Sequence, residues 1–283
     1  MEFLLSSPLK LNLTLRITGR KENGLHELQS VFFRIEGPET LLVRTPSPAA
    51  RDRIAVYNCV IKNENIIDKA LKLLRKANLA RQPVEIELYK AIPPGTGLGA
   101  GSGNAAALVE WARRTFGGPK MFGFEKEIGA DVPFLCSSID IARVGGVGEK
   151  LDPIPGTFRF SGLVLIPAWR SETGKAYLEI DRKAAGRWMP EEKAIEESET
   201  VLSLLASGRK AGLLPNDFLG VLLDRHNEYD EFFSLVEKAG ALAWGLSGSG
   251  SAAFALFPHK ADCRGCGTML AQAKGIERIF YWE

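Results

Sequence analysis

Polar and apolar residues alternate near the start of the chain. Between residues 10 and 15, leucines alternate with Lys10, Asn12 and Thr14. Successive side chains of a strand point to opposite faces, so the leucines would form a core face and the three polar residues would share the other face. A polar turn region follows over residues 18–26. This segment is therefore predicted to be a strand with one buried side.

Similar patterns predict a mixed series of elements in the first half of the chain. β-branched residues with partial alternation indicate strands, and apolar residues at helical spacing indicate helices. The predicted strands are residues 27–35, 40–45, 53–61, 84–89 and 139–144, and the predicted helices are residues 65–78, 104–116 and 121–128.

The second half combines helices with a mainly antiparallel sheet, which predicts an α+β fold. Residues 153–156 contain the proline and glycine typical of a boundary, so the predicted domains are residues 1–153 and 154–283. Strands are predicted at residues 160–166, 242–246, 252–257 and 276–282, and helices at residues 173–181, 191–205, 227–239 and 261–274.

Glycine occupies every second position from Gly95 to Gly103, between a predicted strand and a predicted helix. Glycines let the backbone approach a ligand, and a helix N-terminus supplies free N–H groups, so this loop suits a phosphate. A flexible linker is the alternative, which the tight position between strand and helix disfavours. A Walker A loop is excluded because Asn104 follows Gly103, and Pro93-Pro94 weakens a dinucleotide fingerprint. These residues alone leave the type of phosphate ligand open.

The composition is that of an ordinary globular protein. The 283 residues carry a formal net charge of +2, with 45% hydrophobic and 25% charged residues. This balance gives no reason to expect a nucleic-acid or membrane partner, and no apolar run approaches the roughly 20 residues of a membrane span. The N-terminus lacks the basic region and cleavage site of a signal peptide, so a cytoplasmic location is expected.

Several single residues could either carry chemistry or serve the structure. Lys10 has the ordinary interpretation of a solvated strand residue, and a lone histidine such as His26 is usually structural. Asp131 stands between small and apolar residues, which indicates either a functional carboxylate or a helix cap. Cys263 and Cys266 could form a redox or metal pair, but no further Cys/His set completes a zinc site, so unpaired thiols are favoured.

Three stretches together resemble the GHMP kinase superfamily. They are residues 8–13, which read Pro-Leu-Lys-Leu-Asn-Leu, residues 94–106, which contain the glycine-rich loop, and residues 245–255, which contain Ser-Gly-Ser-Gly-Ser. Taken alone, this Ser/Gly turn is either a hairpin turn or the edge of a phosphate site. Each stretch is weak by itself, but their order and spacing extend over nearly the whole chain.

Within that superfamily the sequence is most similar to the 4-diphosphocytidyl-2-C-methyl-D-erythritol kinase family. Residues 23–32 resemble that family's Gly-Tyr-His-x-Leu-Gln motif, and residues 129–134 match its Gly-Ala-Asp-Val-Pro-Phe. Residues 142–149 and 216–218 resemble two further segments of the family.

The resemblance implies an ATP-dependent kinase that uses Mg²⁺ and phosphorylates the 2-hydroxyl of 4-diphosphocytidyl-2-C-methyl-D-erythritol. It implies a two-domain α+β architecture, with a mixed sheet and helices in the N-terminal domain, an antiparallel sheet and helices in the C-terminal domain, and the active site in the cleft between them. Asp131 would correspond to the catalytic base. Lys10 would lie beside it, favour its ionised form and offset charge in the transition state.

The same resemblance implies roles for further residues. His26 would hydrogen-bond the cytosine edge, Asn12 would help to hold the substrate, and Tyr177 falls where the family has a pyrimidine-stacking aromatic residue. The Mg²⁺ ligands stay open, with Ser102 as a candidate, and a monomer or a weak homodimer is expected. The ATP phosphates would be held by Pro94, Gly95, Thr96, Gly97, Leu98, Gly99, Ala100, Gly101, Ser102, Gly103 and Asn104.

The sequence also departs from the family pattern. Leu25 replaces its tyrosine, Gly103 replaces its second serine, and the segment before Asp131 is shorter by about two helical turns. These departures bear on substrate and metal affinity rather than on the type of reaction. The alternatives are another GHMP kinase of homoserine or mevalonate type, a related mevalonate-diphosphate decarboxylase, and a catalytically weak nucleotide-binding module.

Overall fold

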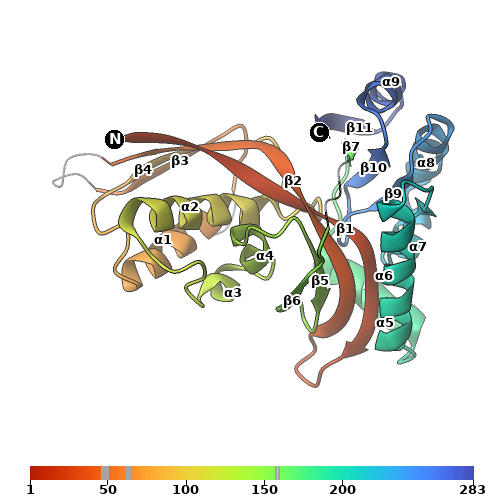
Figure 1. Ribbon diagram of the computed structural model, residues 1–283, viewed down its shortest axis with the longest axis horizontal. Coiled ribbons are helices and arrows are strands. Elements are labelled where there is room, and N and C mark those ends of the chain that lie inside the picture. Colours follow the sequence, from red (N-terminus) through yellow and green to blue (C-terminus); the bar gives the residue numbers. More distant parts are fainter. Residues whose placement is uncertain (46–50, 62–64, 157, 159) are drawn as a thin grey trace. The chain divides into compact units, whose positions relative to one another are not determined.

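The computed structural model describes residues 1–45, 51–61, 65–156, 158 and 160–283 (Figure 1). The chain forms two compact units, the first made of residues 1–10, 34–94 and 99–140, and the second of residues 11–33, 95–98 and 141–283. The segments interleave because two long strands, β1 (Glu2–Arg20) and β2 (His26–Arg44), each contribute to both units. The domain boundary predicted between residues 153 and 154 stays a prediction, as does a site in a cleft between the domains.

In the first unit, helices cover a mixed sheet. β3 (Arg53–Tyr57) runs parallel to β4 (Glu85–Tyr89), and β4 pairs antiparallel with residues 40–44 of β2. Figure 1 shows the helices α1 (Ile66–Lys76) and α2 (Ala100–Phe116) packed side by side. The short helices α3 (Glu125–Ile128) and α4 (Val132–Cys136) follow, and α4 packs against α2.

The sequence of α1 explains why this helix forms where it does. Asn65 caps its N-terminus, since its Oδ1 accepts a hydrogen bond from the amide of Ile67 at 3.1 Å. Ile67, Ala70, Leu71 and Leu74 make the buried stripe, as predicted, and belong to one hydrophobic cluster with the sheet. Burying each of the larger side chains contributes about 1.5–3 kcal/mol, so the stripe attaches the helix firmly to the sheet.

The second unit contains a mainly antiparallel sheet. Among the described strands, only the β8–β9 pair of this sheet is parallel. The strand order is β11 (Ile276–Trp282), β7 (Ser161–Pro167), β10 (Ala253–Phe257), β9 (Ala243–Leu246) and β8 (Gly212–Leu213). The α+β class, with a mixed sheet and a mainly antiparallel sheet, is therefore confirmed.

Two further strands and several helices complete the second unit. β5 (Ile141–Gly145) pairs antiparallel with β6 (Lys150–Pro153) and with residues 30–33 of β2. α8 and α9 pack against each other and against strands of the second sheet, around a core rich in aromatic side chains. The helices are α5 (Thr173–Ala184), α6 (Glu191–Ala206), α7 (Leu219–Leu223), α8 (Glu228–Lys238) and α9 (Lys260–Leu270).

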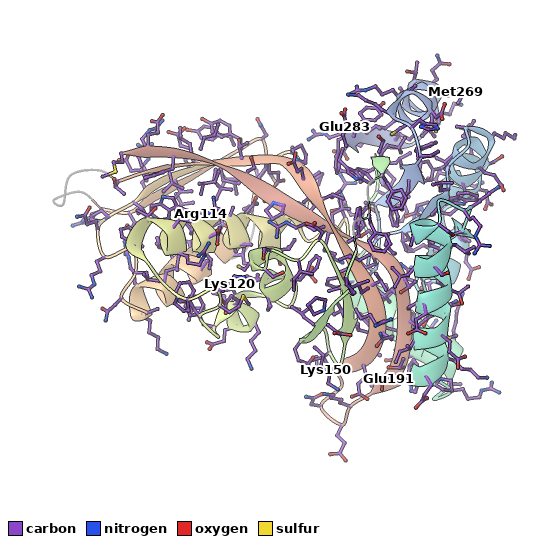
Figure 2. All side chains as sticks on the ribbon, viewed as in Figure 1. Arg114, Lys120, Lys150, Glu191, Met269 and Glu283 are labelled. Carbon is purple, nitrogen blue, oxygen red and sulfur yellow. The ribbon has the colours of Figure 1, made fainter. Side chains whose placement is uncertain are left out.

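Cys263 and Cys266 lie on the buried face of α9 as free thiols. Burial raises the pKa of Cys263 to about 12 and that of Cys266 to about 11, so both thiols stay protonated at neutral pH. Met269 of the same helix lies at the surface, where Figure 2 labels it. The prediction of unpaired thiols is confirmed.

The structure corrects several predicted boundaries. The strands predicted at residues 27–35 and 40–45 form one continuous strand, β2. Gly37 and Pro38 are residues typical of turns, but here the glycine lets β2 pass close to β1, since a Cβ at Gly37 would lie 2.4 Å from the carbonyl oxygen of Ser7. α2 begins at Ala100 rather than at residue 104, and therefore includes part of the glycine-rich loop.

Short elements and element ends account for other differences. α4, α7, β6 and β8 contain five residues or fewer, too few to show a periodicity, and the sequence pattern does not predict them. β3 ends at Tyr57, α3 begins at Glu125 and α9 ends at Leu270, each inside the predicted bounds. Within the part of the chain that the structure describes, no helix is long and apolar enough to cross a membrane.

Candidate active site

A buried carboxylate lies at the base of the glycine-rich loop in the first unit. Glu39 of β2 is fully buried and pairs with Lys90 at 2.7 Å. It also accepts hydrogen bonds from the amide of Ile92 at 2.7 Å and from Asn104 Nδ2 at 2.8 Å. Because Ile92 precedes the loop and Asn104 follows it, Glu39 joins the two ends of the loop. Sequence reasoning missed this residue, since a single glutamate in a strand carries no signal.

The loop enters α2 through a residue that must be glycine. Gly99 has φ 67°, a left-handed conformation that side chains rarely adopt. Four residues later, a Cβ at Gly103 would lie 1.9 Å from the carbonyl oxygen of Pro8. The first turn of α2 carries no acidic residue and no side-chain cap, so its free amides can receive an anion.

Lys10 and Asp131 come together beside Gly99. A Cβ at Gly99 would lie 3.0 Å from Asp131 Oδ2 and 3.2 Å from Lys10 Cγ. Burial lowers the pKa of Lys10, and the charge of Asp131 opposes part of this shift. Asp131 occupies the N-cap position of α4, but its side chain makes no capping hydrogen bond. Helix capping therefore does not account for this carboxylate.

Arg34 holds the other end of the helix that Asp131 begins. Its Nη1 donates to the carbonyl oxygens of Leu135 and Ser137, both at 2.7 Å. The amide of Leu135 in turn donates to the carbonyl oxygen of Asp131 at 3.1 Å. These bonds stabilise the single turn of α4 and so the position of Asp131. The sequence gives no sign of this role, because Arg34 belongs to a distant strand.

In the second unit, the first part of the loop binds the Ser/Gly turn at residues 247–251. The amide of Ser251 donates to the carbonyl oxygen of Gly95 at 3.1 Å, and Ser247 Oγ donates to that of Gly97 at 3.0 Å. A Cβ at Gly97 would lie 2.0 Å from the carbonyl oxygen of Ser247, so the two backbones touch. The turn joins β9 to β10 and also packs against the glycine-rich loop.

Asn12 is bound to the same turn. Its Oδ1 accepts a hydrogen bond from the amide of Gly248 at 2.8 Å, and its Nδ2 donates to Ser30 Oγ at 2.9 Å. Asn216 adds two bonds from its Nδ2, to the carbonyl oxygens of Leu246 and Gly248. Asn12 thus positions the turn, and its contact with substrate stays a prediction.

The structure brings His26 and Tyr177 together in the second unit. Their rings stack with centroids 4.5 Å apart and an angle of 25° between the planes. His26 Nε2 lies 2.6 Å from Asp181 Oδ1, and Trp188 meets the His26 ring edge-on at 5.9 Å. Tyr177 also packs edge-on against Phe218 at 4.8 Å. Asp181 and Trp188 were not predicted, although Asp181 follows Tyr177 by one helical turn on α5 and so shares its helix face.

A hollow of about 610 Å³ lies between α1 and β3 of the first unit. Ile54, Val56 and Leu71 form its apolar part, and Asn65 is at its edge. The Nδ2 atom of Asn65 is buried without a hydrogen-bond partner among the described residues. The neighbouring Ile66 approaches the glycine-rich loop, within 3.6 Å of a Cβ placed on Gly101. Asp52, Asp68, Lys72 and Arg75 also line this hollow, so its wall is charged as well as apolar.

Two models of GHMP kinase domains match parts of the chain. Residues 65–134 match the description "GHMP kinases N terminal domain", and residues 202–263 match "GHMP kinases C terminal". The first match includes the glycine-rich loop and Asp131.

Curated relatives give a closer comparison. The chain is 31% identical to a 4-diphosphocytidyl-2-C-methyl-D-erythritol kinase of Solibacter usitatus, over 88% of this chain and 79% of that one. It is also 31% identical to the protein of the same name from Nitratidesulfovibrio vulgaris strain Hildenborough, over 91% of each chain.

Solved structures agree with these relatives. A crystal structure of 4-(cytidine 5'-diphospho)-2C-methyl-D-erythritol kinase covers 100% of this chain and 98% of its own, with a TM-score of 0.79 and 28% identity. A homoserine kinase from Cytophaga hutchinsonii covers 100% of this chain and 94% of its own, with a TM-score of 0.65 and 17% identity, which is a likeness of fold alone.

Proposed function

Since the chain belongs to the 4-diphosphocytidyl-2-C-methyl-D-erythritol kinase family of GHMP kinases, we propose that it transfers the γ-phosphoryl group of ATP to the 2-hydroxyl of 4-diphosphocytidyl-2-C-methyl-D-erythritol. The chain is thus an ATP-dependent small-molecule kinase. The observation that carries this proposal is the meeting of Lys10 and Asp131 beside Gly99, at the point where the loop enters α2.

Asp131 is the proposed general base. Its carboxylate makes no capping hydrogen bond, so it is available to accept the proton of the attacking hydroxyl. Lys10 is the neighbouring cation, which offsets negative charge as the phosphoryl group moves. Phosphoryl transfer asks the protein mainly for positioning and charge stabilisation, and this pair supplies both.

The glycine-rich loop is the proposed site of the ATP phosphates. Positive φ angles at Gly95, Gly97 and Gly99 turn the loop backbone, and the free amides of α2 favour negative charge. The hollow between α1 and β3 is our candidate for the adenine base, because the neighbouring Ile66 approaches the glycine-rich loop. Glu39 and Lys90 act indirectly, by holding the ends of the loop.

The residues of the first unit fit a magnesium ion that binds with the nucleotide. Among the described residues, no group of three or more His, Cys, Asp or Glu side chains could hold a metal ion by itself. Mg²⁺ usually takes one or two carboxylates and completes its shell with phosphates and water. Ser102 Oγ lies 3.4 Å from a Cβ placed on Gly129, two residues before Asp131. Ser102 is our candidate ligand from the chain, and phosphate oxygens and water would complete the shell; when bound, the ion would offset charge on the phosphates.

His26 and Tyr177 are the proposed contacts of the cytidine end. Their stacked rings form an aromatic surface, and the imidazole of His26 adds a polar atom to it. Stacking and hydrogen bonding together are how proteins bind single bases. Leu25 stands next to His26 and is 52% exposed, which leaves an apolar side chain where the family has tyrosine.

An ADP-release assay tests the proposed function. Mg²⁺-ATP is supplied with 4-diphosphocytidyl-2-C-methyl-D-erythritol, homoserine, mevalonate or galactose, and ADP is followed by a coupled enzyme. We expect turnover with the cytidyl compound alone. Turnover with another acceptor would keep the kinase assignment and refute the substrate. ATP binding without turnover on any acceptor would favour a nucleotide-binding module instead.

A further inference from the structure

We propose that Asp181 fixes the tautomer of His26, and that this tautomer selects a base with an exocyclic amine, as in cytosine, over a base with a carbonyl oxygen at that place, as in uracil. The inference rests on the proposed function, because it concerns the cytidine end of the same substrate. It adds Asp181 as a positioning residue and gives the proton arrangement behind the contact of His26 with the cytosine edge.

The contacts of Asp181 determine which nitrogen of His26 carries hydrogen. Asp181 Oδ1 lies 2.6 Å from His26 Nε2, and its Oδ2 lies 3.3 Å from Arg20 Nη1. A carboxylate with a guanidinium partner accepts hydrogen bonds and has none to donate. The hydrogen of the short contact therefore belongs to Nε2 of the imidazole. In a neutral ring, Nδ1 then carries a lone pair and accepts.

The surroundings of His26 hold this ring in place. Tyr177 stacks on one face, Trp188 meets the ring edge-on, and the side chain keeps only 9% of its surface exposed. No hydrogen bond reaches Nδ1 from the described part of the chain. Because the ring orientation is fixed, Nδ1 can accept a hydrogen bond only from a donor that the ligand places in one direction.

Pyrimidine bases differ at the position that such an acceptor would read. Cytosine has an amine at C4, which donates, and uracil has a carbonyl oxygen there, which accepts. A lone pair on Nδ1 facing that oxygen leaves both atoms unpaired and desolvated, which disfavours the complex. A site that hydrogen-bonds an N–H group of its ligand strongly disfavours an analogue without that group. This discrimination is larger than that of an apolar pocket against a ligand that lacks one methylene.

Nitrogen-15 NMR of the imidazoles tests the tautomer directly, without any substrate. The chain has only three histidines, so His226→Gln and His259→Gln variants assign the His26 signals. We expect the Nε2–H tautomer in the wild type. Asp181→Asn should increase the Nδ1–H form, because an amide can also donate to Nε2. A predominant Nδ1–H form in the wild type would overturn the proposal, even if the variant does not fold.

Kinetics test the consequence for selectivity. The ratio of kcat/KM for the cytidine substrate to kcat/KM for its uridine analogue should fall roughly tenfold in Asp181→Asn, the effect of one hydrogen bond, while KM for ATP stays the same. Asp224→Asn is the matched control, because Asp224 pairs with the exposed Lys183 at 2.6 Å and lies outside the site. An unchanged ratio in Asp181→Asn would overturn the proposal. If the wild type phosphorylates neither compound, the proposed function fails, and the NMR result alone decides the tautomer.

Discussion

Lys90 and Glu39 form a buried ion pair at 2.7 Å, with side chains 6% and 0% exposed. The pair lies under the glycine-rich loop, because the same carboxylate binds the amide of Ile92 and the side chain of Asn104. An ion pair removed from water contributes little net stability, but each partner depends strongly on the other. The position of the glycine-rich loop therefore depends on this ion pair, and the loss of either residue should destabilise it.

Lys90→Met should destabilise the protein by about 3–5 kcal/mol, because it leaves the charge of Glu39 buried without its cation. Urea unfolding of the wild type and the variant measures the difference. Lys175→Met is the matched control, since Lys175 pairs with Glu172 at the surface, where both side chains are 68% exposed. The control should change stability by less than about 1 kcal/mol. Equal effects of the two variants would contradict the structural role of Lys90.

Asp131→Asn should reduce turnover by about 10²–10⁴ and leave ATP binding nearly unchanged, since the amide keeps the shape of the side chain but cannot accept the proton. Steady-state ADP release and nucleotide titration measure the two effects. Asp230→Asn, an acidic residue in the first turn of α8, is the control and should have no effect on turnover. Turnover near that of the wild type in Asp131→Asn would refute the assignment of the base.

Lys10 should make stability depend on alkaline pH. Burial lowers its pKa from the ordinary value of 10.5, although the charge of Asp131 opposes this. Between the lowered pKa and 10.5, the unfolded chain binds more protons than the folded one, so the free energy of unfolding rises with pH. The wild type should therefore gain stability relative to Lys10→Met through this window, by at most about 1.4 kcal/mol per pH unit. Urea unfolding of both proteins at several pH values measures this, and parallel curves would contradict it.

Gly103→Ala should destabilise the protein by about 1–3 kcal/mol, because the new Cβ meets the backbone of Pro8. Gly101→Ala is the matched control in the same helix turn, where a Cβ would first meet Ile66 at 3.6 Å. That variant should be neutral or more stable by up to about 1 kcal/mol. Thermal unfolding compares them, and similar melting temperatures would argue against the close approach. In this chain a serine at position 103 would meet the same backbone.

Much of the fold and part of the candidate site could be predicted from local sequence. The cap and buried stripe of α1 follow from residues within a few positions of one another, and so does the glycine-rich loop between β4 and α2. The resemblance added Lys10, Asp131, His26 and Tyr177 as site residues. Their roles stay proposals, but the structure does place Lys10 near Asp131 and His26 against Tyr177.

Sequence by itself therefore determined most of the longer helices and strands, because periodicity, caps and turns depend on neighbouring residues. The short elements α4, α7, β6 and β8 and the continuity of β2 came only from the structure. Only the tertiary structure decided that Asp181 binds a histidine 155 positions earlier, and that Arg34 holds a carbonyl 101 positions away. Such contacts depend on how whole elements pack, and a single acidic or basic residue carries no local mark of its partner. The charges and aromatic rings were visible in the sequence, and their pairing came from the fold.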